Sequence, residues 1–276
     1  MTARLDGRVA LVSGSGRGIG RQVALKLAAE GARVVVNDLD ADPAAQTAEM
    51  IRDMGGEAAI CAGSVTEDGF AQRFVDTGVN AFGGLDIIVN NAGYTWDNVV
   101  QKMTDEQWHA IIDVHLTAPF QILRAAAPVI RDKARAEADA GQEVFRKVVN
   151  ISSIAGTGGN AGQINYSAAK AGIIGLTRAM AKEWGRYKVN VNAVAFGPIR
   201  TRLTEGSAKG DSTIKVEGKD IRVGVSPDLL SQMETSIPLG RVGTPEEAAG
   251  AVYLFCAPES NFISGQYVIC GGGFVI

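Results

Sequence analysis

Residues 9–20, which read VALVSGSGRGIG, decide the fold of this chain. The apolar run that opens this segment predicts a buried strand, and residues 19–30 predict a helix. Glycines in the turn between them allow the backbone to approach a bound group closely, where a Cβ would block it. A strand, a glycine-rich turn and a helix place the unpaired N–H groups of the helix N-terminus against an anion such as pyrophosphate. Taken alone, the loop is equally consistent with a simple turn.

The rest of the chain repeats this alternation of strand and helix. Apolar runs lie at 9–12, 34–36, 58–61, 87–90, 147–151, 189–194 and 267–270, and helical patterns lie near 19–30, 43–54, 67–82, 105–133, 164–185 and 245–256. The runs are rich in Val and Ile and mostly do not alternate with polar residues, as in parallel strands buried on both faces. We therefore expect an α/β fold, a Rossmann-type doubly wound parallel sheet of about seven strands with helices on both faces.

No linker or repeat interrupts this pattern, so residues 1–276 are expected to form a single domain. Two stretches break the rhythm. Residues 131–147 are densely charged and predict a solvated helix extension followed by a loop. Residues 199–242 form a long connection rich in Gly, Ser and Lys beyond the carboxyl end of a strand, where open α/β sheets bind ligands. We expect a substrate lid there, with a disordered insertion as the alternative.

Composition limits the partners and the compartment. A net charge of −3 over 276 residues gives no reason to expect nucleic acid or an acidic membrane surface. The three cysteines are odd in number and lack a CxxC spacing, which argues against disulfides and a zinc site, and no metal is expected. The chain shows neither the apolar core of a signal peptide nor a membrane-spanning run, so a cytoplasmic protein is expected.

Ser153, Tyr166 and Lys170 form the strongest chemical constellation. Tyr166 and Lys170 are four residues apart at the start of a predicted helix, so their side chains share one face. A tyrosine with a pKa of ~10 is a poor base near neutrality, but a nearby ammonium favours the phenolate. Ser153 follows a strand at the carboxyl edge of the sheet, where its hydroxyl can donate to a carbonyl oxygen. Together these groups can exchange a proton with an alcohol or a ketone.

These residues, taken with three further motifs, resemble the short-chain dehydrogenase/reductase family. The matching motifs occur in the family's order over essentially the whole chain: Gly14-x-x-x-Gly18-x-Gly20, Asn90-Asn91-Ala92-Gly93, Ser153 followed by Tyr166-x-x-x-Lys170, and Gly197-x-Ile199-x-Thr201. The resemblance implies NAD(P)-dependent hydride transfer between a secondary alcohol and a ketone. It also implies Tyr166 as acid/base, Lys170 as the group that lowers its pKa and holds the ribose, and Ser153 as the residue that positions substrate.

The resemblance further implies a cofactor pocket that Asn90 and Gly93 shape, with Ile199 and Thr201 beside the nicotinamide carboxamide. Besides Tyr166 and Lys170, its expected residues are Gly14, Arg17, Gly18, Ile19, Gly20, Asp38, Ser64, Val65, Asn91, Ala92, Gly93, Gly197, Ile199 and Thr201. An acid at Asp38 can accept hydrogen bonds from the adenosine ribose and repel a 2′-phosphate. Arg17 argues the other way because it can pair with that phosphate. We weigh Asp38 more heavily and expect NAD(H) to be favoured over NADP(H).

Four positions depart from the family pattern. Ser13 replaces a Thr, Phe196 replaces a Pro, Ser64 replaces an Asp that contacts adenine, and His115 replaces an Asn. In the family, that Asn is thought to hold a water in a proton relay to the lysine. A neutral His115 could also bind a water, although a histidine ordinarily titrates near pH 6.5. The alternative is a buried histidine that is satisfied by the backbone.

Short strings also suggest a substrate class. Residues 153–176 resemble 3-oxoacyl-thioester reductases, and residues 35–39 and 113–117 resemble 3-hydroxyacyl-CoA dehydrogenases, which implies an acyl-CoA or acyl carrier protein substrate. The alternatives are a sugar, steroid or terpenoid alcohol dehydrogenase, or a regulator that binds a dinucleotide without turnover. The helix after Tyr166 is apolar or small almost all round and therefore needs cover on more than one side. The resemblance implies a homodimer or homotetramer through this helix and that at 105–133.

Overall fold

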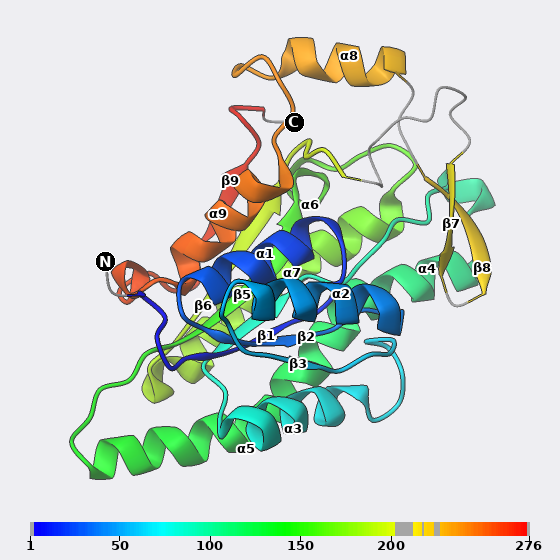
Figure 1. Ribbon diagram of the computed structural model, residues 1–276. Coiled ribbons are helices and arrows are strands. Elements are labelled where there is room, and N and C mark those ends of the chain that lie inside the picture. Colours follow the sequence, from blue (N-terminus) through cyan, green and yellow to red (C-terminus); the bar gives the residue numbers. More distant parts are fainter. Residues whose placement is uncertain (1–2, 202–211, 217, 224–226, 275–276) are drawn as a thin grey trace.

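The core of the protein is one seven-stranded parallel sheet (Figure 1). The computed structural model describes residues 3–201, 212–216, 218–223 and 227–274. In sheet order the strands are β3 (Ala58–Ile60), β2 (Arg33–Val36), β1 (Val9–Val12), β4 (Ile87–Asn90), β5 (Arg146–Ser153), β6 (Val189–Phe196) and β9 (Tyr267–Cys270). The predicted strands are confirmed, and β5 and β6 each run two residues further at their carboxyl ends.

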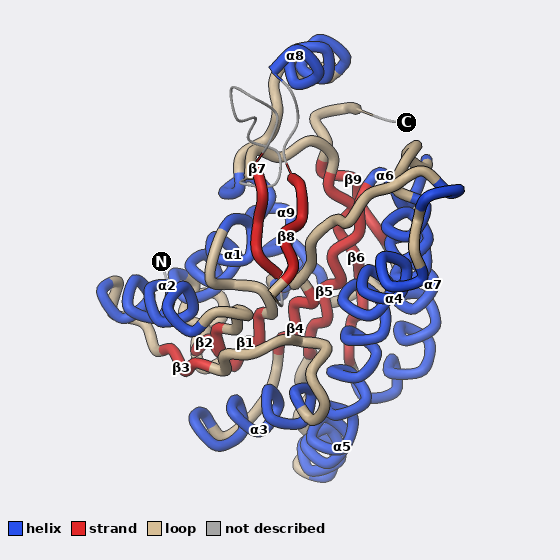
Figure 2. Tube along the Cα trace, turned by 90° about the vertical axis from the view of Figure 1, so that its right-hand side faces the viewer, coloured by secondary structure: helices blue, strands red, loops and turns tan. Residues whose placement is uncertain are grey.

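Helices cover both faces of the sheet (Figures 1 and 2). One face carries α1 (Gly18–Ala29), α2 (Ala41–Asp53) and α9 (Pro245–Cys256), and the other carries α3 (Phe70–Phe82), α5 (Ala118–Asp139) and α7 (Ile164–Trp184). In β1, Ala10 and Val12 pack toward the first group and Val9 and Leu11 toward the second. Because successive side chains point to opposite faces, a strand covered on both sides is apolar throughout. None of the helices within the described ranges is long and apolar enough to cross a membrane.

The chain changes direction across the sheet between β1 and β4. From β1 the chain proceeds to β2 and β3 on one side, whereas β4, β5 and β6 follow on the other. Ser13, just after β1, ties the two sides together, because its hydroxyl accepts hydrogen bonds from the backbone N–H groups of Asn91 (3.0 Å) and Ala92 (3.1 Å). In open parallel sheets, ligands bind at the carboxyl ends of the strands next to such a reversal.

The helix predicted at 105–133 is instead built from three parts. It comprises α4 (Asp105–Ile112), a π-helical turn (Asp113–Thr117) and α5, which continues to Asp139. A capping box at Thr104 and Gln107 starts α4, since each side chain bonds the other residue's backbone N–H. A π-helical turn is rare and frequently occurs at a functional site. Here the turn carries His115.

The prediction of a solvated stretch at 131–147 holds for the end of α5 but is wrong for Arg146 and Lys147, which are buried at the start of β5. The Lys147 ammonium donates to Asn190 (2.9 Å), Ser260 (3.1 Å) and Asn261 (2.7 Å). A charged side chain can enter a core when its donors all find acceptors. The acceptors come from distant parts of the chain, so a local charge pattern does not reveal them.

The long connection at 199–242 contains regular structure that the sequence pattern did not show. Strands β7 (Ser212–Val216) and β8 (Lys219–Val223) form an antiparallel hairpin, and α8 (Pro227–Ser236) follows. The hairpin stands beside α4 in Figure 1, where Lys219 pairs with Glu106 at 2.5 Å. Ile221 is buried against Tyr94 and Trp96. Residues 202–211, 217 and 224–226 of the expected lid lie outside the described residues.

Candidate active site

A pocket of about 1050 Å³ lies at the carboxyl edge of the sheet, beside the reversal between β1 and β4. The site residues predicted from the sequence all line it: Gly14, Arg17, Gly18, Ile19, Gly20, Asp38, Ser64, Val65, Asn91, Ala92, Gly93, His115, Ser153, Tyr166, Lys170, Gly197, Ile199 and Thr201. Asn90, which we expected to shape the pocket, is buried beneath it and donates to Asn150 Oδ1 at 2.8 Å. The fold therefore brings four distant motifs to one cavity.

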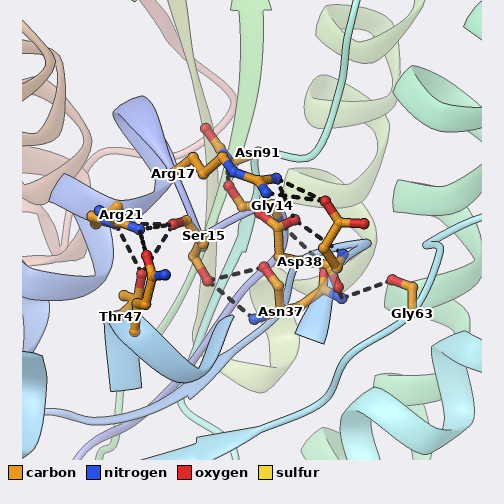
Figure 3. A network of polar contacts seen from close by, with 12 residues as sticks. Gly14, Ser15, Arg17, Arg21, Asn37, Asp38, Thr47, Gly63 and Asn91 are labelled. Atoms are coloured by element: carbon orange, nitrogen blue, oxygen red, sulfur yellow. Dashed lines mark hydrogen bonds and ion pairs between the residues drawn. The ribbon is translucent and has the colours of Figure 1, made fainter. Parts of the chain in front are cut away.

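The glycine-rich loop forms a cradle at the start of α1 (Figure 3). The Arg17 side chain makes no capping bond to the helix, and the first turn holds no acidic residue. The backbone N–H groups in the first turn of α1 are therefore available to an anion. Gly14 has φ +61°, and a Cβ on it would stand 2.7 Å from the Cα of Ala92, while a Cβ on Gly20 would overlap the carbonyl of Gly14. Such a cradle fits the pyrophosphate of a dinucleotide.

Asn37, which the sequence analysis missed, holds this loop from behind (Figure 3). Its Oδ1 accepts the backbone N–H of Gly14 at 3.0 Å, and its Nδ2 donates to the carbonyls of Cys61 (2.9 Å) and Gly63 (3.1 Å). One buried amide thus joins the ends of β1, β2 and β3. The only signal in the sequence is a polar residue at the end of an apolar run, directly before Asp38.

Asp38 and Arg17 form an ion pair in the pocket lining, beside the glycine-rich loop. Arg17 donates to Asp38 Oδ1 at 3.3 Å and to Asp40 Oδ2 at 3.1 and 3.0 Å. Asp38 Oδ1 also accepts the backbone N–H of Asp40 at 3.2 Å. A Cβ at Gly16 would overlap the Asp38 carboxylate, so this glycine lets Asp38 lie against the loop. Two carboxylates therefore engage the guanidinium that was expected to compete for a phosphate.

The end of β5 positions the three catalytic candidates. Ser153 ends the strand and its hydroxyl forms a hydrogen bond with the Tyr166 side chain. Lys170 is buried and donates to the Ile151 carbonyl at 2.8 Å, with its Nζ 5.5 Å from the centre of the Tyr166 ring. Ser152 fixes this turn of α7 by donating to the Lys170 carbonyl at 2.7 Å. The predicted shared face of Tyr166 and Lys170 is confirmed.

Burial shifts the proton affinities of this pair in opposite directions. It raises the pKa of Tyr166 to about 12, against the lowering effect of the Ser153 hydrogen bond. It lowers the pKa of Lys170 to about 7, because a charged ammonium loses its hydration there. Tyr166 therefore holds its proton at neutral pH and is ready to act as an acid. A protonated Tyr166 can donate to a ketone oxygen, whereas removal of a proton from an alcohol needs its phenolate.

His115 packs edge-on against Tyr166, with ring centres 5.0 Å apart. Its Nε2 bonds the Tyr94 carbonyl at 2.7 Å, whereas its Nδ1 is buried with no partner among the described residues. A carbonyl only accepts, so Nε2 carries the hydrogen and Nδ1 is an acceptor. Burial, and then the charge of Lys170, hold the pKa of His115 well below 6.5. A Cβ at Gly93 would overlap the imidazole, which explains the glycine.

The sequence analysis also missed a polar group on the substrate side of the pocket. Asp97, Asn160 and Gln163 line the cavity together with Tyr166. Gln163 donates to Asp97 at 2.7 Å, and partial removal from water raises the pKa of Asp97. Asp97 follows β4 at a distance and Gln163 precedes α7, so no local motif joins them. No cluster of His, Cys, Asp and Glu side chains within the described ranges could hold a metal ion.

A nucleotide cradle beside a Tyr–Lys–Ser group defines a dinucleotide-dependent oxidoreductase. The family described as Enoyl-(Acyl carrier protein) reductase matches residues 14–275. Over 100% of both chains, the protein is 39% identical to the 3-oxoacyl-[acyl-carrier-protein] reductase of Synechocystis sp.. It is 34% identical to 3-oxoacyl-[acyl-carrier-protein] reductase FabG of Vibrio cholerae, over 98% of each chain.

Solved structures agree with these relatives. The fold matches a putative short-chain alcohol dehydrogenase from Sinorhizobium meliloti with a TM-score of 0.85 and 29% identity, over 99% of this chain and 98% of that one. It matches a putative gluconate dehydrogenase from Agrobacterium tumefaciens with a TM-score of 0.82 and 30% identity, over the same shares. The chain belongs to the short-chain dehydrogenase/reductase family. It is an oxidoreductase that interconverts a secondary alcohol and a ketone with a nicotinamide dinucleotide.

Proposed function

We propose that the protein reduces 3-oxoacyl thioesters to 3-hydroxyacyl thioesters, with acyl-CoA or acyl carrier protein as the carrier. The supporting observation is that Ser153, Tyr166 and the buried Lys170 meet in the wall of a large pocket, where burial raises the pKa of Tyr166 to about 12. Full-length relatives named 3-oxoacyl reductases point to the same substrate class. The family description names an enoyl group instead, but a protonated phenol paired with a second hydroxyl donor suits a ketone oxygen.

In this proposal each residue has a distinct role. Ser153 donates a hydrogen bond to the ketone oxygen, and Tyr166 transfers its proton to that oxygen as negative charge develops there. The bound cofactor supplies the hydride to the carbonyl carbon. Lys170, held by the Ile151 carbonyl, keeps further N–H donors for the ribose and restores the proton on Tyr166.

The pyrophosphate would be held by the glycine-rich loop, through Gly14, Gly18, Ile19 and Gly20. The two nucleoside ends would be held by a second group of lining residues: Ser64, Val65, Asn91, Ala92, Gly197, Ile199 and Thr201. We propose NAD(H) over NADP(H). Asp38 and Asp40 together engage Arg17, so a 2′-phosphate would meet two carboxylates and lose its cationic partner. Ribose hydroxyls, by contrast, are donors that a carboxylate accepts.

The deciding experiment follows reduced-nicotinamide absorbance with acetoacetyl-CoA, using NADH and NADPH in parallel. We expect rapid loss of absorbance with NADH and a kcat/KM at least about tenfold lower with NADPH, as one repulsive buried contact gives. Loss with NADPH alone would overturn the role given to Asp38. No loss with either cofactor, while sugar, steroid or terpenoid ketones are reduced, would overturn the thioester assignment.

We further propose that neutral His115 holds the Tyr94 carbonyl through Nε2–H and offers Nδ1 to a water that replenishes the proton on Lys170. His115→Asn keeps an N–H donor and an acceptor, so we expect kcat within about threefold of wild type. His115→Leu removes both, and we expect kcat to fall about tenfold, the size of one lost hydrogen bond. Steady-state kinetics at pH 7.5 measure the two values, with NADH binding as the check on folding. Equal losses in both variants would contradict the relay.

Two proposals concern the rest of the molecule. The first is that the β7–β8 hairpin, whose Lys215, Val216 and Lys219 line the pocket, forms part of a substrate lid on a single domain spanning 1–276.

The second proposal is a homodimer or homotetramer through α7 and α5, because small side chains on α7 and Phe120 on α5 (48% exposed) face solvent. Sedimentation velocity tests this, and a monomer at micromolar concentration would contradict it. A cytoplasmic location stays a prediction from the sequence.

A further inference from the structure

A chain of three amide and carboxylate groups runs along the pocket wall beside Tyr166 and has no part in the proton transfer. Asn160 Nδ2 donates to Gln163 Oε1 at 2.8 Å, and Gln163 Nε2 donates to Asp97 Oδ2 at 2.7 Å. These two bonds set the direction of the Gln163 amide, since its oxygen must face Asn160 and its nitrogen must face Asp97. Gln163 thus holds one oxygen of the Asp97 carboxylate, in a residue that lines the cavity.

The backbone on either side of Asp97 is also fixed. Asn165 Nδ2 donates to the Trp96 carbonyl at 3.1 Å, and the N–H of Asn98 donates to the Gly162 carbonyl at 2.9 Å. Asn165 is fully buried, and its Oδ1 accepts the backbone N–H of Tyr166 at 2.8 Å. One side chain therefore positions both the Asp97 segment and the start of the helix that carries Tyr166. Such a second layer of contacts is what keeps a binding group in register with a reacting one.

The Asp97 carboxylate keeps a spare acceptor. Gln163 occupies Oδ2, while no donor from the described residues bonds Oδ1. A carboxylate has room for several hydrogen bonds and accepts the strongest of them from N–H and O–H groups. Asp97 is exposed and lines the pocket, so its Oδ1 is accessible to a donor group of a bound substrate. The site therefore suits a substrate with a neutral donor near its ketone and disfavours an anionic group there.

Building on the thioester assignment above, we propose that Asp97 determines specificity by accepting a hydrogen bond from the first amide N–H of the pantetheine arm. Gln163 is its positioning residue. In a 3-oxoacyl thioester, a methylene, the thioester and an ethylene group separate this N–H from the ketone, so the N–H can reach the wall beside Tyr166 while the ketone oxygen meets the Tyr166 hydroxyl. The pantetheine arm is common to acyl-CoA and acyl carrier protein, so Asp97 would recognise the same amide N–H in both carriers.

The test compares two small substrates that differ in one group. They are the 3-oxobutyryl thioester of N-acetylcysteamine and its 2-acetoxyethanethiol analogue, in which an ester oxygen replaces the amide N–H. For wild type we expect kcat/KM to favour the amide by about tenfold, as for one charge-assisted hydrogen bond. In Asp97→Ala that ratio falls to about one, mainly through a higher KM for the amide. Gln163→Ala lowers the ratio in the same direction by less.

The matched control is Asp53→Ala, which removes an exposed carboxylate at the end of α2, outside the pocket, and should keep the wild-type ratio. NADH binding, followed by fluorescence, checks that each variant is folded. Equal loss on both substrates in Asp97→Ala, or no amide preference in wild type, would overturn the role of Asp97 while leaving thioester reduction intact. Failure of wild type to reduce either thioester would overturn the proposed function and this inference together. Should Asp97→Ala not fold, the wild-type and Gln163→Ala ratios decide.

Discussion

Replacing Tyr166 by Phe lowers kcat for ketone reduction by about a thousandfold or more, within the range attributed to general acid catalysis. The change removes one hydroxyl and keeps the ring that packs against His115. That hydroxyl is the proposed proton donor, and burial raises its pKa to about 12, so it keeps its proton in the neutral range. The glycine cradle does not involve the hydroxyl, and the dissociation constant for NADH should stay within about twofold of wild type.

The matched control is Tyr187→Phe, which removes a phenolic hydroxyl from a residue outside the pocket. We expect its kcat to equal that of wild type. Stopped-flow reduction and fluorescence titration of NADH measure turnover and cofactor binding separately. Persistent turnover in Tyr166→Phe would show that another group donates the proton. A wild-type protein that binds NADH tightly and turns over no ketone would instead favour the regulator considered above.

Replacing Arg146 by Met lowers the free energy of unfolding by about 3–5 kcal/mol, the cost of breaking a buried ion pair by removing one partner. The Arg146 side chain is only 2% exposed. It donates to both carboxylate oxygens of Glu137, at 2.8 and 2.5 Å, and to the Leu85 carbonyl at 3.2 Å. Without it, the partly buried Glu137 carboxylate and the Leu85 carbonyl lose their charged donor. Urea unfolding followed by circular dichroism measures the loss.

Two further variants test the cause. Arg146→Met combined with Glu137→Leu should recover most of the lost stability, because the unpaired carboxylate is gone. Arg131→Met breaks the exposed pair with Asp132 and should cost less than about 1 kcal/mol. The ion-pair explanation fails if the double variant is as unstable as Arg146→Met. None of these three residues lines the pocket, so kcat of the folded variants should equal that of wild type.

The strands and the glycine-rich loop could be predicted because their signals are local. A strand buried on both faces must be apolar throughout, and the turn after β1 needs glycine where Gly14 takes a positive φ against the Ala92 backbone. The helical spacing of Tyr166 and Lys170 places both on one face without any tertiary information. Because this spacing is local, the sequence identified Tyr166 and Lys170 as catalytic candidates. The motif becomes specific only in combination with the glycine-rich loop.

Other features depend on contacts between distant residues. The π-helical turn that presents His115, the bond from His115 to the Tyr94 carbonyl and the burial that keeps the imidazole neutral are absent from any local pattern. The same holds for Asn37, whose partners lie at the ends of other strands. Arg146 was predicted to lie in a solvated stretch because its partners, Glu137 and the Leu85 carbonyl, approach it only in the folded chain.

The sequence by itself determined the parallel sheet, the nucleotide-binding loop and the Ser153, Tyr166 and Lys170 set, because hydrophobic period, glycine conformation and helical spacing act over a few residues. Only the tertiary structure decided the protonation of the site and the wall that meets the substrate. Burial sets the opposite pKa shifts of Tyr166 and Lys170. The Asp97–Gln163 pair joins the loop after β4 to the residue before α7, which lie 66 residues apart in the sequence. Desolvation and long-range hydrogen bonding are properties of the folded whole.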